Sequence, residues 1–311
     1  MPLGLIGVQF ALALISDDRA PSVPSFDLHW LLLCGGACIS LTYGLEVLGH
    51  AVTRWAVMTA FIGAGLFLGT LALRHLRRAK QSLIPLVARR IPTYAMTLRG
   101  GSLFRVSVTM VPFLPPTMFQ LGFGLNPFAS GLLIIPLFAG SLGTKIMTTR
   151  MLRRYGFRRV LLVNGAMTTL AILGCAALTP STSYAVIVVV LFANGLTGSL
   201  QFSALNSLAF ADVPSEHMST TNTLANVVQQ LTLGLGITVA AADVHLAALL
   251  HREAALGLTL TDFRTAIVAA AIVTAVSTLD ALALSQDAGS LVSGHRPLAS
   301  KHENDVANSR A

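Results

Sequence analysis

Long runs of apolar residues constrain this 311-residue chain more than any other feature of its sequence. A helix needs about 20 such residues to cross the hydrocarbon core of a bilayer. The runs lack the alternation of polar and apolar residues that is typical of membrane barrel strands. We therefore expect an all-α polytopic membrane protein with eight full transmembrane helices and a partial helix at residues 2–15. The eight predicted spans are 28–48, 52–73, 95–121, 127–148, 160–179, 184–210, 219–249 and 264–285.

The composition excludes several classes of protein. Only 11% of the residues are charged and 54% are hydrophobic, whereas soluble domains carry roughly 25% charged residues. Phosphate-binding loops, zinc-protease motifs and serine-hydrolase motifs are absent from the sequence, so we expect no enzyme. The three cysteines fit no metal or haem spacing, so we expect neither a metal nor a cofactor. In a membrane protein the net charge of +8 reports topology rather than binding to nucleic acid.

The basic residues gather in two connections that lie on one side of the predicted bundle. Residues 74–94 hold six Lys or Arg and residues 150–159 hold five, whereas the loops on the other side contribute only Arg54, Arg252 and Arg264. Because basic loops stay in the cytoplasm, we expect a multi-pass protein of the inner membrane with a cytoplasmic carboxyl terminus. The polar tail 286–311 is predicted to be disordered, and residues 78–94 to lie along the cytoplasmic interface.

Two of the predicted spans carry stripes of polar side chains. Such residues are costly in lipid and often mark a functional site. They either line a hydrated substrate path or join helices by hydrogen bonds worth about 0.6 kcal/mol each. Taken together, the two stripes favour a substrate cavity. Its candidate residues are Asn194, Gln201 and Asn206 on the first span, accompanied by Thr197, and Asn222, Asn226, Gln229 and Gln230 on the second.

Charged residues inside the spans are the second group of candidates. Arg105 lies about ten residues into its span, roughly 15 Å along a helix, which is too deep for its charge to reach water easily. We expect Arg105 to face the bundle interior, either in a structural ion pair or on a substrate or proton path. Its candidate partners are Glu46, Asp243 and Asp280. Three prolines at 112, 115 and 116 predict a kink in the same helix.

Several segments resemble the major facilitator superfamily, in its fourteen-span multidrug/proton antiporter branch. They are FDLHWLLLCGGACISLTYGLE (26–46), GGSLFRVSVTMVPFLPPTMFQLGFGLNPFASGLLIIP (100–136) and LRRYGFRRVLLVNG (152–165). The third is similar to a cytoplasmic signature of the family, G-x-x-x-D-R-x-G-R-R. Gly156, Arg158 and Arg159 fit this signature, whereas Arg153 occupies its acidic position.

The resemblance implies a domain organisation and a function. Residues 1–15 look like the end of the family's sixth span, 16–94 like two central helices with an interfacial segment, and 95–285 like the carboxyl-terminal six-helix bundle, followed by the tail 286–311. The implied function is secondary active transport, namely the proton-coupled efflux of small organic compounds. The implied partners are this substrate, protons, membrane lipid, and an amino-terminal half or a second copy of the chain. The alternative is a truncated membrane remnant that does not transport.

Overall fold

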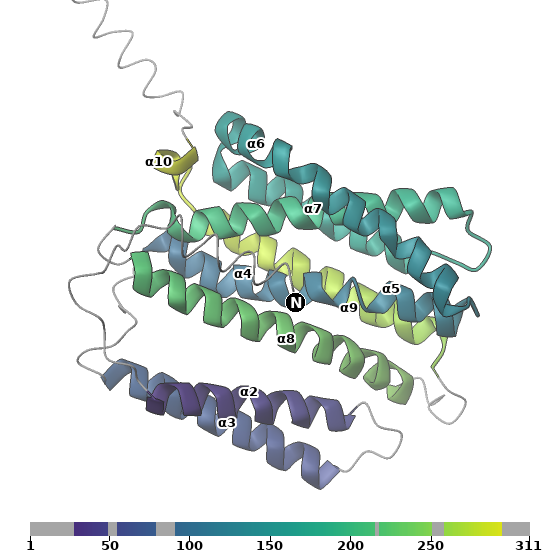
Figure 1. The fold of residues 1–311 in the computed structure, drawn as a ribbon, viewed down its shortest axis with the longest axis horizontal. Coiled ribbons are helices and arrows are strands. Elements are labelled where there is room, and N and C mark those ends of the chain that lie inside the picture. The colour runs from purple at the N-terminus through teal and green to yellow at the C-terminus, as the bar shows by residue number, and fades with distance from the viewer. Residues whose placement is uncertain (1–27, 49–54, 79–90, 215–217, 251–257, 294–311) are drawn as a thin grey trace, which may run out of the picture.

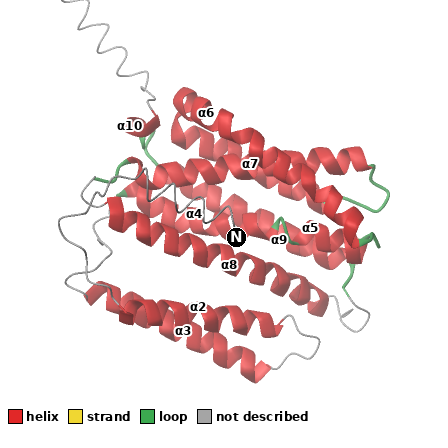
Figure 2. Cartoon of the chain, in the orientation of Figure 1, coloured by secondary structure: helices red, strands yellow, loops and turns green. Residues whose placement is uncertain are grey.

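The computed structural model describes residues 28–48, 55–78, 91–214, 218–250 and 258–293. Within these ranges the chain forms helices and connecting segments and no strand (Figure 2), which confirms the all-α expectation. The elements are α2 (Leu28–Leu48), α3 (Trp55–Arg78), α4 (Pro92–Met110), α5 (Leu114–Thr117), the π-helix η2 (Met118–Gly122), α6 (Pro127–Ala176), α7 (Tyr184–Ala211), α8 (Met218–Leu250), α9 (Leu260–Leu279), the 3-10 helix η4 (Asp280–Ala283) and α10 (Ser290–Ser293). The predicted partial helix 2–15 lies outside the described residues.

The long helices run side by side in layers (Figure 1). Helices α6 and α7 pack together on one side, and α4 and α9 lie in the middle with α8. The pair α2 and α3 lies on the opposite side, where α2 contacts α8. Helix α4 contacts α7, α8 and α9, so its side chains occupy the centre of the bundle.

Six helical stretches among the described residues are long and apolar enough to cross a membrane by length and composition. They are Trp55–Ala72, Pro127–Thr144, Met147–Ala176, Tyr184–Ala211, Leu224–Ala248 and Leu260–Ala283. The apolar stretch of α2, Leu28–Gly44, is shorter. The predicted span 95–121 is divided between α4, α5 and η2. Six of the eight predicted spans thus correspond to these stretches, and the other two to α2 and to this divided segment.

Proline divides the predicted span 95–121, as expected. A proline ring removes one backbone donor and clashes with the carbonyl four residues earlier, and α4 ends at Met110, two residues before Pro112. The Phe113 amide then bonds to the Met110 carbonyl at 3.1 Å in a tight turn. The chain resumes as the short α5 and the π-helix η2.

The predicted loop 150–159 is helical instead. Helix α6 runs through it, and its two limbs meet at Gly156, whose φ of 74° and ψ of 164° are not helical. The charged residues of this segment predict that it lies in contact with water. They do not predict whether its backbone is helical. At this bend α6 reverses direction (Figure 1), at the end of the bundle where α3 ends and α4 begins.

The beginning of the predicted disordered tail also needs correction. Residues 286–293 form turns and the short helix α10, which packs against α6 and α7. Gly289 has a φ of 68°, and a methyl group there would lie 2.6 Å from the Phe157 ring. This segment is therefore fitted closely against the bend of α6, while residues 294–311 lie outside the described part.

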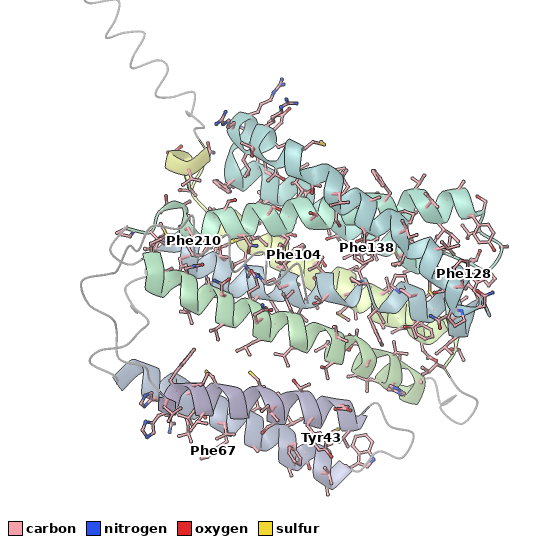
Figure 3. All side chains as sticks on the ribbon, in the orientation of Figure 1. Tyr43, Phe67, Phe104, Phe128, Phe138 and Phe210 are labelled. Carbon is pink, nitrogen blue, oxygen red and sulfur yellow. The ribbon has the colours of Figure 1, made fainter. Side chains whose placement is uncertain are left out.

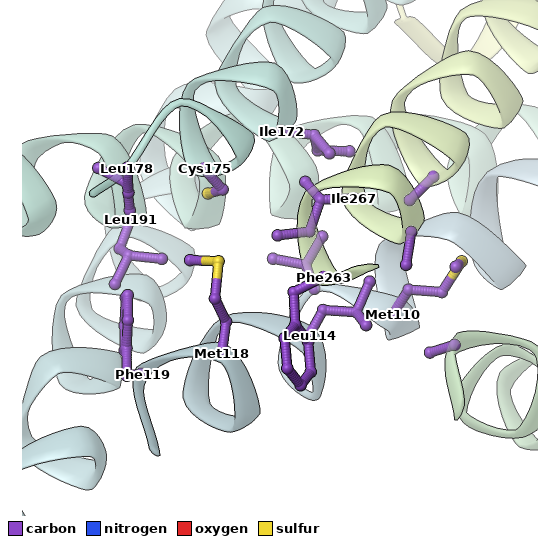
Figure 4. Close-up of a cluster of buried hydrophobic side chains, with 14 of the residues drawn as sticks. Met110, Leu114, Met118, Phe119, Ile172, Cys175, Leu178, Leu191, Phe263 and Ile267 are labelled. Atoms are coloured by element: carbon purple, nitrogen blue, oxygen red, sulfur yellow. The ribbon is translucent and has the colours of Figure 1, made fainter. Parts of the chain in front are cut away.

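Apolar side chains from α4 to α9, with Ala240 and Val244 contributed by α8, form the largest core cluster (Figure 4). Met118, Phe119 and Phe263 have no exposed surface in it. Glycines allow the helices to approach closely beside this cluster: a methyl group on Gly195 of α7 would lie 2.7 Å from the Leu137 carbonyl carbon of α6. The backbones of α6 and α7 are thus in direct contact, which is the typical use of small residues between membrane helices.

Candidate polar site at the centre of the bundle

Arg105 occupies the centre of the bundle, as the sequence predicts. It projects from α4, and only 3% of its surface is exposed. Its Nη2 donates a hydrogen bond of 2.8 Å to Oδ1 of Asn206 on α7, and its Nη1 donates one of 3.3 Å to the Thr97 carbonyl. The guanidinium carbon lies 5.9 Å from the ring centroid of Phe202. Arg105 therefore links α4 to α7 through neutral groups.

The three candidate carboxylates occupy other places. Asp280 accepts a hydrogen bond of 3.1 Å from the Gly100 amide and lies 3.7 Å from Nη2 of Arg99. Glu46 is exposed close to the end of α2, and Asp243 is half-buried on α8. Among the described residues, the hydrogen-bond acceptors around Arg105 are thus an amide and a backbone carbonyl rather than an acid.

The amides of α7 fasten this helix to the second limb of α6. Asn194 and Gln201 are each 2% exposed. Gln201 donates a hydrogen bond of 3.1 Å from Nε2 to the Leu161 carbonyl, and Asn194 Nδ2 lies 3.8 Å from Sγ of Cys175. Both side chains make the contacts expected of the alternative role, which is hydrogen bonding between helices.

Sequence reasoning missed Asn164, the partner of this stripe. Its Nδ2 donates to the Thr197 carbonyl at 2.8 Å and to Oε1 of Gln201 at 3.0 Å. Asn164 is 5% exposed and lies in the predicted span 160–179, where no second amide forms a stripe with it. The only signal in the sequence was a single amide inside an apolar run.

The stripe on α8 has a different environment. Asn222, Asn226 and Gln230 are exposed and Gln229 is half-buried. Asn226 donates a hydrogen bond of 2.9 Å from Nδ2 to Oδ1 of Asn222 along the same helix. The α7 amides Asn194 and Gln201 are buried against α6, whereas the α8 amides are exposed or half-buried. The two predicted stripes therefore do not form one continuous cavity wall in this conformation.

The segment that resembles the cytoplasmic signature lies at the bend of α6. Arg153 and Arg159 are exposed and Arg158 is half-buried. Nitrogen-bearing side chains project away from the bundle at this bend (Figure 3). The backbone of Gly156 lies in a region of φ and ψ that is essentially restricted to glycine, which explains the glycine at this position of the segment.

Comparison with known families decides the classification of this bundle. The sequence model of the family described as "Major Facilitator Superfamily" matches residues 47–237, which is more than half of the chain. The chain belongs to the major facilitator superfamily. Membership classes it with multi-pass membrane transporters rather than with enzymes, in agreement with its apolar helices.

This superfamily member is similar to bacterial proteins that are named as multidrug resistance proteins, MdtD. MdtD of Escherichia coli O157:H7 is 31% identical over 244 residues, and MdtD of Citrobacter koseri is 30% identical over 242 residues. Each match covers 77% of this chain and 51% of the relative. The chain therefore spans about half the length of the curated relatives that it matches.

Proposed function

We propose that this bundle belongs to a secondary active transporter that exports small organic compounds across the inner membrane in exchange for protons. The buried contact between Arg105 and Asn206 is the observation that carries the proposal, because it places a charge at the junction of α4 and α7. Charged residues inside transmembrane segments are rare and usually mark a substrate or ion pathway. Export of organic compounds agrees with the name of the MdtD relatives, multidrug resistance proteins. Proton exchange follows the family resemblance alone.

The proposed pathway is lined by the polar side chains that form no hydrogen bond with α6 among the described residues. These are Arg105 and Asn206 between α4 and α7, together with the α8 amides Asn222, Asn226, Gln229 and Gln230. Asn194 and Gln201 are proposed instead to hold α6 and α7 together as one unit, since their amides bind α6. Alternating access in such transporters requires units that rock as rigid bodies around a fixed site.

The exposed amides of α8 also bear on the partners of the bundle. The hydrogen bond between Asn226 and Asn222 uses only one polar group of each side chain. An amide group that faces hydrocarbon without a partner is costly, so the remaining groups need water or another polypeptide beside them. We assign this role to a second wall of the pathway, formed by a complementary amino-terminal half or by a second copy of the chain. Lipid would cover the apolar outer faces.

The proposal is tested with everted membrane vesicles from cells that express the chain. Export corresponds to uptake into such vesicles, so a fluorescent organic compound should accumulate when respiration is active and be released after a protonophore is added. Arg105→Gln should abolish this accumulation. Arg99→Gln is the matched control, because Arg99 lies on the same helix with a side chain that is 70% exposed, and it should retain at least half of the accumulation.

Two results would count against this function. Accumulation equal to that of vesicles without the chain would favour a membrane protein that does not transport. Equal accumulation by the wild type and by Arg105→Gln would show that the contact between Arg105 and Asn206 is not part of the transport pathway.

A further inference from the structure

Arg105 retains hydrogen-bond donors that nothing in the described bundle uses. A guanidinium carries five N–H groups. The hydrogen bonds to Thr97 and Asn206 occupy one on each terminal nitrogen. The Nε atom is buried and has no partner among the described residues. Leaving such a donor unsatisfied is destabilising, and more so when the group is charged.

Among the described residues, no carboxylate forms an ion pair with Arg105 either. Both of its hydrogen-bond acceptors are neutral, and the carboxylate of Asp280 is engaged by Gly100 and Arg99. Leaving a buried cation without an anion is strongly destabilising. An anion that reached Arg105 would relieve this penalty and fill the free donors.

The neighbouring groups favour an organic carboxylate. A guanidinium presents its donors in a planar fork that matches the two oxygens of a carboxylate. Asn206 accepts from Arg105 through its oxygen, so its amide N–H₂ provides further donors at the same place. Phe202, which is half-buried, lies beside the guanidinium and offers an apolar surface.

We infer that Arg105 and Asn206 bind the carboxylate of an amphipathic organic anion, with its apolar part against Phe202. This inference rests on the proposed transport function, because it names the substrate class of the same site. It also separates the two polar regions of the bundle: the α7 amides that bind α6 maintain the structure, whereas Arg105 selects the charge of the substrate.

The test compares two compounds of nearly the same shape that differ in charge. Naphthalene-2-carboxylate and naphthalene-2-carboxamide are titrated against the purified full chain in nanodiscs of zwitterionic lipid, with empty nanodiscs as the reference. We expect the wild type to bind the carboxylate at least tenfold more tightly than the carboxamide. Arg105→Gln should reduce this preference to less than twofold, whereas Arg99→Gln should preserve it.

The comparison of the two compounds needs only the wild type, so the inference remains testable even if Arg105→Gln does not fold. Asn206→Leu serves as a second variant and should lower the preference at least threefold. The inference is overturned if the wild type binds both compounds equally or binds neither, or if the preference survives in a folded Arg105→Gln protein.

Binding and transport fail separately in these experiments. A charge preference that depends on Arg105, in a chain that accumulates nothing in everted vesicles, would support the binding site and reject the transport function. Proton-dependent accumulation without any charge preference would reject the substrate class and leave the transport function standing.

Discussion

The contact between α6 and α7 predicts a large effect from a single methyl group. In Gly195→Ala the new methyl would lie 2.7 Å from the Leu137 carbonyl carbon and 3.0 Å from its Cα, whereas ordinary contact begins at 3.4 Å. The two backbones would have to separate by at least about 0.7 Å, the difference between the first of these distances and ordinary contact. Overpacking of this kind typically costs about 1–3 kcal/mol.

The same separation would stretch hydrogen bonds between the two helices. Ser141 Oγ donates to the Gly195 carbonyl at 3.2 Å, Ser199 Oγ to the Ser141 carbonyl at 3.1 Å, and Thr144 Oγ1 to Ser199 Oγ at 2.9 Å. Each of these hydrogen bonds is worth about 0.6 kcal/mol in a membrane protein. Their weakening therefore adds to the cost of overpacking.

The assay is unfolding by sodium dodecyl sulfate, followed by circular dichroism of the purified chain. Gly131→Ala on α6 is the matched control, because a methyl group there meets nothing within 4 Å. Alanine has the higher helix propensity by about 1 kcal/mol, so this control should be as stable as the wild type or slightly more stable. A free energy of unfolding for Gly195→Ala within about 0.5 kcal/mol of the control, the usual range for surface substitutions, would refute the close contact.

Three further predictions concern the bundle. Asn164→Ala and Gln201→Ala should be non-additive by about 0.6–1.7 kcal/mol in the same unfolding assay, because their side chains share a hydrogen bond of 3.0 Å; strictly additive losses would contradict that bond. Gly156→Ala should lower the free energy of unfolding by about 1–3 kcal/mol, because φ is 74° and ψ is 164° at this residue, and an unchanged unfolding midpoint would argue against the bend. Arg154→Cys should react with an impermeant thiol reagent only from the cytoplasmic side and Ser181→Cys only from outside, because basic segments remain in the cytoplasm and both positions are exposed; reaction of both from one side, or of each from the opposite side, would contradict this topology.

The sequence predicts the extent of the helices well where apolar runs set it. The predicted span 28–48 coincides with α2, and the span 184–210 differs from α7 by one residue. These limits follow from local chemistry, since prolines and polar residues interrupt the runs. The reversal between the predicted spans 127–148 and 160–179 is confirmed, but its tightness was not predictable, because both limbs of α6 continue as helix up to the single non-helical residue Gly156.

The polar site was predictable by residue type but not by partner. The depth of Arg105 in its span correctly placed it inside the bundle, where it is 3% exposed. Its contact with Asn206 joins positions 101 residues apart, and helical periodicity carries no information about such a pair. The amides of α7 and α8 differ for the same reason. Periodicity predicts a similar stripe on each helix, but the packing of α6 against α7 buries only the α7 stripe.

The central claim is that this bundle performs proton-coupled transport through a site that contains Arg105. The most direct measurement is uptake of a fluorescent organic anion by proteoliposomes that hold the purified chain, under an imposed pH gradient. The account predicts uptake in the wild type that stops when the gradient is collapsed and is lost in Arg105→Gln. Uptake at the same rate with and without the pH gradient, or no faster than in liposomes without protein, would contradict the claim.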